Sequence, residues 1–381
     1  MNIPLFQHDL PGRELQDLAQ ELCNGNMMHG STTETLSHEL AQQTKQSEGV
    51  VFATYADAAS LLLMAMDIHE GHEIILPAFA STTMTTAVLS TGATPVYADC
   101  NPRTLNIDAE AIQKLVRPET RAIVATNVFG NPADLPQIAS LCGQLEIPMI
   151  EDVSGGLGAT VDGRHAGSFG WASIIDLGEG SVIGCGQGGG VTTSNLHLAQ
   201  RCRSLQSGAA LDCSRNQDDH PGPIGRQSRL TDIQAAVAMS QLRHIDEILS
   251  ARASAASSYT QRLAGTSDLV IPTVDPGTSR GWPAFVVRLD DAYGCDERDE
   301  ILGGMDRHDI AVAAPWTPPP LIPQVSDRTT VEDDRNGWPV AEFVSQRTIA
   351  LPIFGGLTDR DVGLVTQTLE LMMQRTTFRR S

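Results

Sequence analysis

Short apolar runs alternate with longer amphipathic segments through the first two thirds of the chain. Residues 49–68 and 72–99 each begin with an apolar run and continue with helical periodicity. Residues 121–130 and 147–155 are apolar runs that end in polar residues, and a helical pattern with an N-terminal cap lies between them at 131–146. This alternation predicts an α/β fold, in which helices cover both faces of a mostly parallel sheet.

The last third of the chain has a different pattern. Residues 229–263 form one long helical stretch, which we expect to carry the chain into a second domain. Beyond it lie a strand at 282–289, a proline-rich loop at 315–324 and a closing helix at 358–373. These elements predict a smaller α+β domain. The expected division is an N-terminal arm (1–20), a large domain (21–245) and a small C-terminal domain (246–381).

Charge and composition narrow the class of protein. Acidic residues outnumber basic ones by 46 to 26, and the net charge of −20 argues against nucleic acid and anionic membranes as partners. The chain has no apolar run of about 18 residues and does not begin like a signal peptide, so we expect a cytoplasmic protein. Its seven cysteines are scattered without a CxxC pair, which argues against a disulfide framework or a zinc site.

The stretch IIDLGEGSVIGCGQGGGVTTSN, residues 174–195, is rich in glycine and follows an apolar run. Glycine-rich loops between a strand and a helix offer exposed backbone amides to a small ligand. This loop carries two carboxylates, Asp176 and Glu179, and no lysine or arginine. It therefore predicts an acidic pocket for a small molecule.

Four separated motifs occur in the chain, at residues 72–108, 147–170, 229–242 and 338–362. Their order resembles that in the DegT/DnrJ/EryC1/StrS family of sugar aminotransferases. The resemblance implies a fold-type-I aminotransferase-like architecture, in which a large domain has a mostly parallel, seven-stranded sheet between helices and a smaller α+β domain follows. It implies action on nucleotide-linked keto-sugars with pyridoxal 5′-phosphate (PLP), and a homodimer with its site between subunits. A heteromer with a paralogue is the alternative assembly.

The family's lysine, which forms an imine with PLP, has no counterpart in this alignment. Counting inward from GSFG at 167–170 or from CGQGG at 185–189 places Ser181 at the lysine position. A serine hydroxyl cannot form an imine with an aldehyde. The chain has only two lysines, Lys45 and Lys114, and both precede this region.

The family's phosphate-binding positions also differ here. Ala56 and Asp57 replace a glycine and a threonine, Asp176 replaces a serine, and Gln227 replaces an asparagine. Two carboxylates facing a phosphate dianion would cost on the order of 4 kcal/mol per close charge pair at an effective dielectric near 20. We therefore predict that PLP binding is lost. Asp57 and Asp176 are then expected to fill the phosphate space, satisfied by helix amides and by Arg226 or Arg229 of a second subunit.

Of three positions that contact the cofactor ring in the family, only one matches here. Asp152 stands where the family pairs an aspartate with the pyridinium nitrogen, while Gly155 replaces a glutamine and Ser81 replaces an aromatic residue. Asp152 alone does not require a cofactor, because a carboxylate at a strand end also accepts hydrogen bonds from loop amides. Trp316, in the proline-rich loop, is placed to cover a ligand.

Three hypotheses of function remain open. The first is a non-aminotransferase homologue, a pseudoenzyme that acts as a ligand-binding, regulatory or partner subunit. The second is a PLP-independent enzyme of sugar or natural-product biosynthesis, whose acidic cleft works by acid–base chemistry or holds Mg²⁺ or Mn²⁺. The third is a PLP- or pyridoxamine-phosphate-dependent aminotransferase or dehydrase.

The candidate site residues follow from these hypotheses. The catalytic candidates are Asp57, Asp152, Asp176, Glu179 and Ser181. The expected ligand-pocket residues are Tyr55, Ala56, Ser81, Gly155, Cys185, Gln187, Arg226, Gln227, Arg229 and Trp316.

Overall fold

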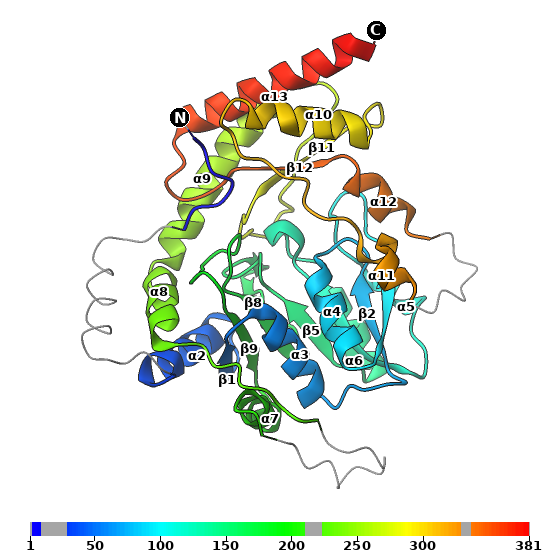
Figure 1. Cartoon of the computed structure of the whole chain (residues 1–381), viewed down its shortest axis with the longest axis vertical. Coiled ribbons are helices and arrows are strands. Elements are labelled where there is room, and N and C mark those ends of the chain that lie inside the picture. The colour runs from blue at the N-terminus through cyan, green and yellow to red at the C-terminus, as the bar shows by residue number, and fades with distance from the viewer. Residues whose placement is uncertain (1, 9–28, 210–222, 329–336, 381) are drawn as a thin grey trace.

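The structure is a computed structural model that describes residues 2–8, 29–209, 223–328 and 337–380. The large domain is built on a seven-stranded sheet (Figure 1). The pairs from β8 to β3 are parallel, and β9 runs antiparallel to both of its neighbours. The mostly parallel sheet that the sequence predicts is confirmed. Its strands, in spatial order, are β1 (Glu48–Phe52), β9 (Gly189–Thr193), β8 (Ala172–Asp176), β5 (Met149–Asp152), β4 (Thr120–Thr126), β2 (Glu73–Pro77) and β3 (Thr94–Ala98).

Helices cover both faces of this sheet because its strands are apolar on both sides. Along β2, Ile74 and Leu76 belong to the core on one face and Ile75 to the core on the other. The first face carries α3 (Tyr55–Ala65), α4 (Thr82–Ser90) and α7 (Leu196–Gln206). The second carries α2 (Ser31–Gln43), α5 (Ala109–Gln113), α6 (Leu135–Leu145) and α8 (Asp232–Leu242).

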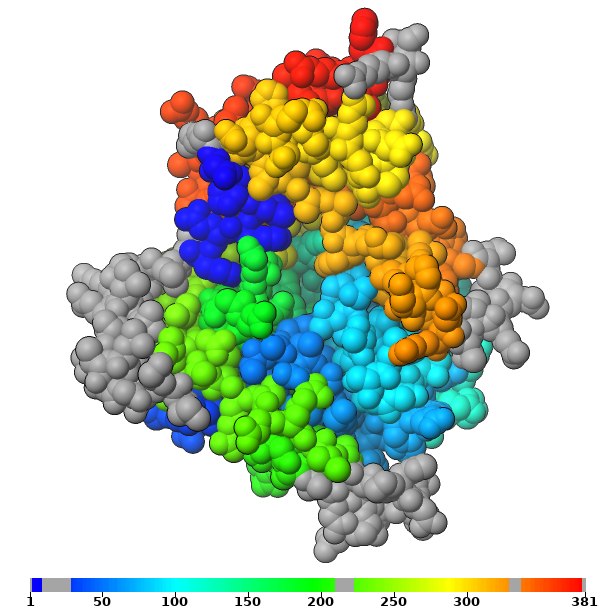
Figure 2. All heavy atoms as spheres, in the orientation of Figure 1, coloured from blue at the N-terminus to red at the C-terminus, as the bar shows by residue number. Residues whose placement is uncertain are grey.

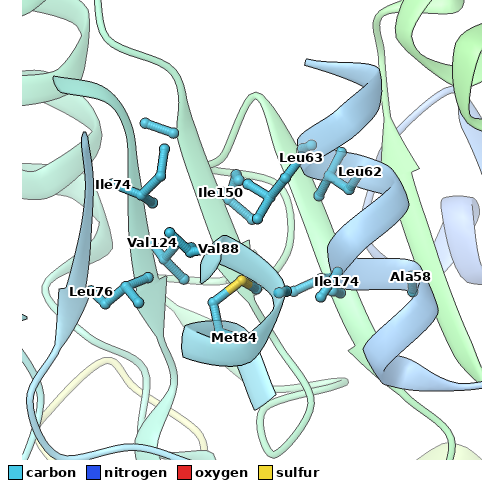
Figure 3. Packing of buried hydrophobic residues seen from close by; sticks show 14 of the residues in the cluster. Ala58, Leu62, Leu63, Ile74, Leu76, Met84, Val88, Val124, Ile150 and Ile174 are labelled. Carbon is cyan, nitrogen blue, oxygen red and sulfur yellow. The ribbon is translucent and has the colours of Figure 1, made fainter. Parts of the chain in front are cut away.

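The packing of α3 fixes the start of this helix beside the sheet. Leu62 and Leu63 are fully buried and lie on the side of the sheet that carries Ile150 and Ile174 (Figure 3). Because the core-facing side of α3 is continuously apolar, its N-terminal turn is held at the edge where β5 and β8 end.

The small domain has an antiparallel sheet of β10 (Leu269–Val270), β11 (Phe285–Leu289) and β12 (Thr348–Leu351). Its core includes Tyr259 and Phe285, whose rings stack with centroids 4.8 Å apart. Its helices are α9 (Ile245–Leu263), α10 (Cys295–Asp306) and α13 (Asp359–Arg380). The short elements are η1 (Val128–Gly130), β6 (Thr160–Val161), β7 (Arg164–His165), η2 (Pro319–Leu321), α11 (Pro323–Ser326) and α12 (Pro339–Ser345).

The long helix predicted at 229–263 is two helices, α8 and α9, separated at His244. His244 has φ −112° and ψ 21°, which interrupts the helical ladder. The break has a packing cause: α8 packs on α2 of the large domain, and α9 packs on α13 of the small domain.

Helix α12 lies far along the chain but packs against the large domain (Figure 1). The indole Nε1 of Trp338 donates a 3.0 Å hydrogen bond to the carbonyl of Tyr97. The backbone amides of Val340 and Ala341 donate to the Asp99 carboxylate at 3.0 and 2.8 Å. Helix α12, which follows the proline-rich loop in the sequence, is therefore attached to the large domain.

Part of the predicted N-terminal arm is described. The amide of Ile3 donates to the carbonyl of Asp309 at 2.9 Å, and the amide of Ala311 donates to the carbonyl of Ile3 at 2.9 Å. Residues 9–20 of the arm lie outside the described residues. Within the described part of the chain, every helix is too short or too polar to span a bilayer.

Candidate functional site

A cavity of about 390 Å³ lies where β4, β5 and β8 end and the small domain faces the large one. Open α/β sheets place ligands at this edge, because the carboxyl ends of parallel strands and their loops converge there. The surface is visibly hollowed between the small domain (yellow) and the large domain (blue and cyan), beside the N-terminal residues (Figure 2). The small domain contributes Pro283, Ala284 and Ala350 to its wall.

Asp152 forms the floor of the cavity at the end of β5 and is only 7% exposed. Its Oδ2 accepts a 3.0 Å hydrogen bond from the Tyr55 hydroxyl, and its Oδ1 accepts bonds from the hydroxyl (2.6 Å) and amide (3.1 Å) of Ser154. Burial raises the pKa of the Asp152 carboxyl. Among the described residues, no basic side chain forms a salt bridge with it. The floor is thus a buried acid with hydrogen bonds but no counterion.

Asp176 is the second acid in the cavity and ends β8. Its Oδ1 accepts a 2.8 Å hydrogen bond from the amide of Gly178, and its own amide donates to the Ser154 hydroxyl at 3.1 Å. Burial raises the pKa of Asp176 to about 6, and the negative charge of Asp152 adds to the rise. Asp176 is therefore close to changing its charge near neutral pH.

Aromatic rings form another wall of the cavity. Phe129 and Trp316 stack with centroids 4.5 Å apart and an interplanar angle of 12°. Phe79 meets Trp316 edge-on, with the centroids 5.5 Å apart. This arrangement gives the cavity an apolar wall. Trp316, which we expected to cover a ligand, is part of that wall, whereas Phe129 carried no signal in the sequence.

The glycine-rich loop closes the cavity on the side of β8. Gly180 has a φ of +85°, and a Cβ there would lie 3.2 Å from the ring of Phe6. Leu5 and Phe6 of the N-terminal segment also line the cavity. Their part in the wall could not be read from the sequence, because it depends on the pairing of Ile3 with the small domain.

Ser181 and Cys185 lack the surroundings of nucleophiles. The Ser181 hydroxyl lies within hydrogen-bonding distance of the carbonyls of Gly178 and Ile183, and neither carbonyl is a base that could accept its proton. Burial raises the pKa of the Cys185 thiol to about 12, and the charge of Asp176 adds to the rise. Both side chains are therefore neutral and stabilise the loop.

Asp57 does not line the cavity. Its Oδ1 accepts a 2.5 Å bond from Nε of Arg226, and its Oδ2 accepts a 2.7 Å bond from the Ser228 hydroxyl. Burial opposes its charge, but the bonds from Ser228 and Arg226 outweigh burial and lower the pKa. The arginine belongs to the same chain, not to a second subunit as predicted. The negative charge of Asp57, in the first turn of α3, is thus balanced by Arg226.

The sequence-predicted residues separate into two groups. The residues that line the cavity are Tyr55, Ser81, Asp152, Gly155, Asp176, Glu179, Ser181 and Trp316. The residues outside its lining are Ala56, Asp57, Cys185, Gln187, Arg226, Gln227 and Arg229. Lining residues that the sequence reasoning did not select are Leu5, Phe6, Thr83, Thr126, Asn127, Phe129, Gly180, Ser154, Pro283, Ala284, Ala313, Pro315 and Ala350.

A lysine that could form an imine and a set of metal ligands are two further features to look for in the cavity. Both lysines are in the described part of the chain, and neither lines the cavity: Lys45 follows α2, and Lys114 pairs with Glu110 at 2.7 Å. Over the described residues, no three His, Cys, Asp or Glu side chains are grouped as metal ligands. The Mg²⁺ or Mn²⁺ alternative therefore has no ligand set in this part of the chain.

Comparison with known proteins identifies the family. Residues 9–370 match the model of the DegT/DnrJ/EryC1/StrS aminotransferase family. The chain belongs to this family. The match spans both domains, so the resemblance seen in four motifs extends over nearly the whole chain.

Two named relatives are similar over most of their length. The chain is 28% identical to the UDP-N-acetyl-3-dehydro-alpha-D-glucosamine 3-aminotransferase of Acidithiobacillus ferrooxidans, with 96% of each chain covered. It is 31% identical to the GDP-perosamine synthase of Caulobacter vibrioides, with 83% of each covered. Among solved structures, Streptomyces venezuelae DesV in complex with a ketimine intermediate superposes with a TM-score of 0.86 at 26% identity, covering 98% of this chain and 99% of that one. The predicted fold-type-I architecture is confirmed.

These relatives contradict two predictions. The first prediction was that the chain has lost PLP binding. The second was that it is a non-aminotransferase homologue or a PLP-independent enzyme. Both predictions are wrong, because full-length relatives are named sugar aminotransferases and DesV was solved with a ketimine intermediate. The structure supplies a physical reason for the error. Of the two carboxylates expected to repel a phosphate, Asp57 is paired with Arg226 outside the cavity, and Asp176 has its pKa raised to about 6.

Proposed function

We propose that this chain is an enzyme of amino-sugar biosynthesis that holds PLP, or its amine form pyridoxamine 5′-phosphate (PMP), by non-covalent contacts in the cavity between its domains. The observation that carries the proposal is Asp152, a buried carboxylate at the cavity floor without a counterion among the described residues. A protonated ring nitrogen would supply that counterion. The names of the full-length relatives support a sugar as the second ligand.

The residues present fit such a ring. Ionised Asp152 would pair with the ring nitrogen, while Tyr55 and Ser154 hold the carboxylate in place through the hydrogen bonds described above. The stacked pair of Phe129 and Trp316 offers an apolar wall to a flat ligand. When bound, a pyridoxal-type cofactor supplies an electron sink for the carbon next to an amine.

The acids of the cavity favour the amine form. Asp176 and Glu179 complement a protonated amine, and no lysine lines the cavity to trap an aldehyde. With a pKa near 6, Asp176 can hold or release a proton at Oδ2 near neutral pH. The rings of Phe6 and Trp316 also line the cavity and help to exclude water from it. The chain's own residues thereby bind and orient the cofactor and move a proton without a covalent attachment.

The assembly that we propose is a homodimer in the cytoplasm, since the family builds its site between two subunits. Native mass spectrometry of the purified chain tests this part. A dimer mass is expected, and a monomer that dimerises only with a paralogue would support the heteromer instead.

Cofactor binding tests the proposed function directly. Equilibrium dialysis of the purified protein with PLP and with PMP should show binding, tighter for PMP. Asp152→Asn should weaken both at least ten-fold, because a charge-assisted contact at a buried site contributes about 1.5–3 kcal/mol. Asp359→Asn, at an exposed carboxylate of the small domain, is the matched control and should bind as the wild type does.

Two outcomes would contradict the proposal. One is the absence of binding for both cofactor forms, and the other is an Asp152→Asn protein that binds them as tightly as the wild type. Borohydride treatment followed by intact mass measurement adds a check on attachment. We expect no cofactor adduct, and an adduct on this chain would refute the non-covalent mode.

A further inference from the structure

A second, smaller cavity of about 40 Å³ adjoins the first. Phe129 and Ala284 line both cavities, so these two residues lie between them. Three arginines line the second cavity: Arg103, Arg280 and Arg288. In a chain of net charge −20 with only 26 basic residues, this is a local concentration of positive charge.

Only one of the three arginines has a carboxylate partner among the described residues. Nη1 and Nη2 of Arg103 donate to the two oxygens of Asp275 at 2.6 and 3.2 Å. Arg280 lies over the ring of Trp282, 5.0 Å from its centroid, and Arg288 lies over Phe343 at 5.4 Å. Within the described ranges, neither of these two guanidinium groups forms a salt bridge.

Two residues that line the second cavity each have a buried polar atom without a hydrogen-bond partner in the described structure: Nε of Arg280 and Oγ1 of Thr348. Thr348 is fully buried, yet it lines the cavity. Burial lowers the pKa of Arg280 to about 10, against the opposing effect of Asp275. A buried donor without an acceptor is destabilising, so an acceptor that reaches these side chains would stabilise them.

The small sheet brings two of these groups together. Arg288 of β11 and Thr348 of β12 are register partners in an antiparallel pair. Directly opposed residues of such a pair project to the same face, with Cβ atoms about 4.5–5.5 Å apart. The side chains of Thr348 and Arg288 therefore lie next to each other on one face of the small sheet, and Arg280 lies in the segment before β11.

We propose that Arg280, Arg288 and Thr348 form a binding site for a phosphoryl group beside the main cavity. Guanidinium groups bind phosphate oxygens through paired, charge-assisted hydrogen bonds, and the threonine hydroxyl donates a further one. A cavity holds one water in about 10–15 Å³, so this one has room for roughly three, about the size of a single phosphoryl group. The source is either free phosphate or the phosphoryl group of a larger ligand that reaches past Phe129 and Ala284.

Calorimetric titration with inorganic phosphate, at constant ionic strength in potassium chloride, tests the site without any cofactor. The wild type should bind phosphate, and Arg280→Gln and Arg288→Gln should each bind at least ten-fold more weakly. Thr348→Val keeps the shape of the side chain and removes its hydroxyl, so it should weaken binding several-fold. Arg262→Gln is the control, since this arginine pairs with Asp359 on the exposed side of α9 and should leave the affinity unchanged.

The outcomes test the phosphoryl site itself, distinguish the two sources of the phosphoryl group, and do so independently of the proposed function. Two results would overturn the proposed site. One is that Arg280→Gln and Arg288→Gln bind phosphate as tightly as the wild type does, and the other is that the wild type binds phosphate no more tightly than chloride. Uridine diphosphate in place of phosphate distinguishes the sources: tighter binding that is lost in Arg288→Gln supports a ligand spanning both cavities, and equal binding supports free phosphate. Failure of PLP and PMP to bind would leave these titrations unaffected.

Discussion

At the scale of single residues, the pKa values of the two cavity acids, Asp152 and Asp176, shift in the opposite direction to that of Asp57. Burial raises the pKa of Asp176 to about 6, whereas hydrogen bonds from Ser228 and Arg226 lower that of Asp57 against the effect of burial. A carboxylate with a raised pKa holds its proton longer in the folded state than in the unfolded state. The stability of the folded protein therefore falls as the pH rises from about 4 to above 6 because of Asp176.

The substitution Asp176→Asn tests this sign. It removes the cost of ionising a buried acid and keeps an oxygen that can accept the hydrogen bond from Gly178. The free energy of unfolding should increase by about 1–3 kcal/mol at pH 7.5, and the gain should shrink toward pH 4. Urea denaturation without cofactor at both pH values measures it. A gain that is the same at both values would contradict the raised pKa.

Asp57→Asn is the matched contrast. It should lower the stability at pH 7.5 by about 1 kcal/mol or less, because the pair with Arg226 is partly exposed. That loss should disappear as the pH falls through the pKa of Asp57 in the folded protein. An increase in stability at pH 7.5 would contradict this prediction, because it would mean that folding raises the pKa of Asp57 as it raises that of Asp176.

The same three acids show how far sequence reasoning reaches at this scale. Asp152 and Asp176 end parallel strands, and strand order alone places them at one edge of the sheet. The orientation of Asp57 depends on Arg226, which lies 169 positions away in the sequence and approaches along the edge of β1. No local pattern encodes that contact. The sequence therefore led to the prediction that Asp57 fills a phosphate space, whereas its carboxylate pairs with Arg226 of the same chain.

At the scale of elements, the start of α3 depends on one cap. The hydroxyl of Thr54 accepts a 3.0 Å hydrogen bond from the amide of Asp57, and α3 carries Tyr55 into the cavity in its first turn. Thr54→Ala should lower the free energy of unfolding by about 1 kcal/mol, as the loss of a side-chain cap does. Thr54→Ser keeps the oxygen and should be close to the wild type in the same denaturation experiment. Equal losses for both variants would mean that the methyl group, not the cap, stabilises this turn.

Periodicity predicted most elements of the large domain because each of them buries a continuous apolar face. It failed where the burial partner changes along one helical pattern. Residues 229–263 are apolar at helical spacing throughout, yet α8 packs on the large domain and α9 on the small one. The break at His244 follows from this change of partner, and the sequence has no glycine or proline there to mark it.

At the scale of the whole molecule, long-range contacts decide which residues surround the cavity. Helix α12 returns to the large domain through Trp338, and the N-terminal segment reaches the cavity through Ile3 and Phe6. Both contacts join segments more than 200 positions apart in the sequence. The family resemblance could supply the overall architecture, but the aromatic wall depends on contacts between segments that are distant in the sequence, such as that of Phe129 with Trp316, and no local pattern predicts these contacts.

Arg252 is the side chain that ties the domains to the glycine-rich loop. It belongs to α9 and is 3% exposed; Nη1 donates to the carbonyl of Trp282 at 3.3 Å, and Nη2 donates to the carbonyl of Val182 at 3.2 Å. Arg252→Met keeps most of the volume and leaves two buried carbonyls without these donors. The cost of such groups predicts a loss of about 2–4 kcal/mol in the free energy of unfolding.

The glycine-rich loop should be destabilised before the whole protein unfolds, because Val182 lies in the loop that carries Glu179 and Ser181 into the cavity. Hydrogen exchange of residues 177–189 should accelerate in Arg252→Met under conditions where the sheet strands remain protected. Arg262→Met, on the same helix but paired with the exposed Asp359, is the control and should change neither the loop nor the denaturation midpoint appreciably. If both variants behaved alike, the contacts of Arg252 would not be what couples domain packing to the shape of the cavity.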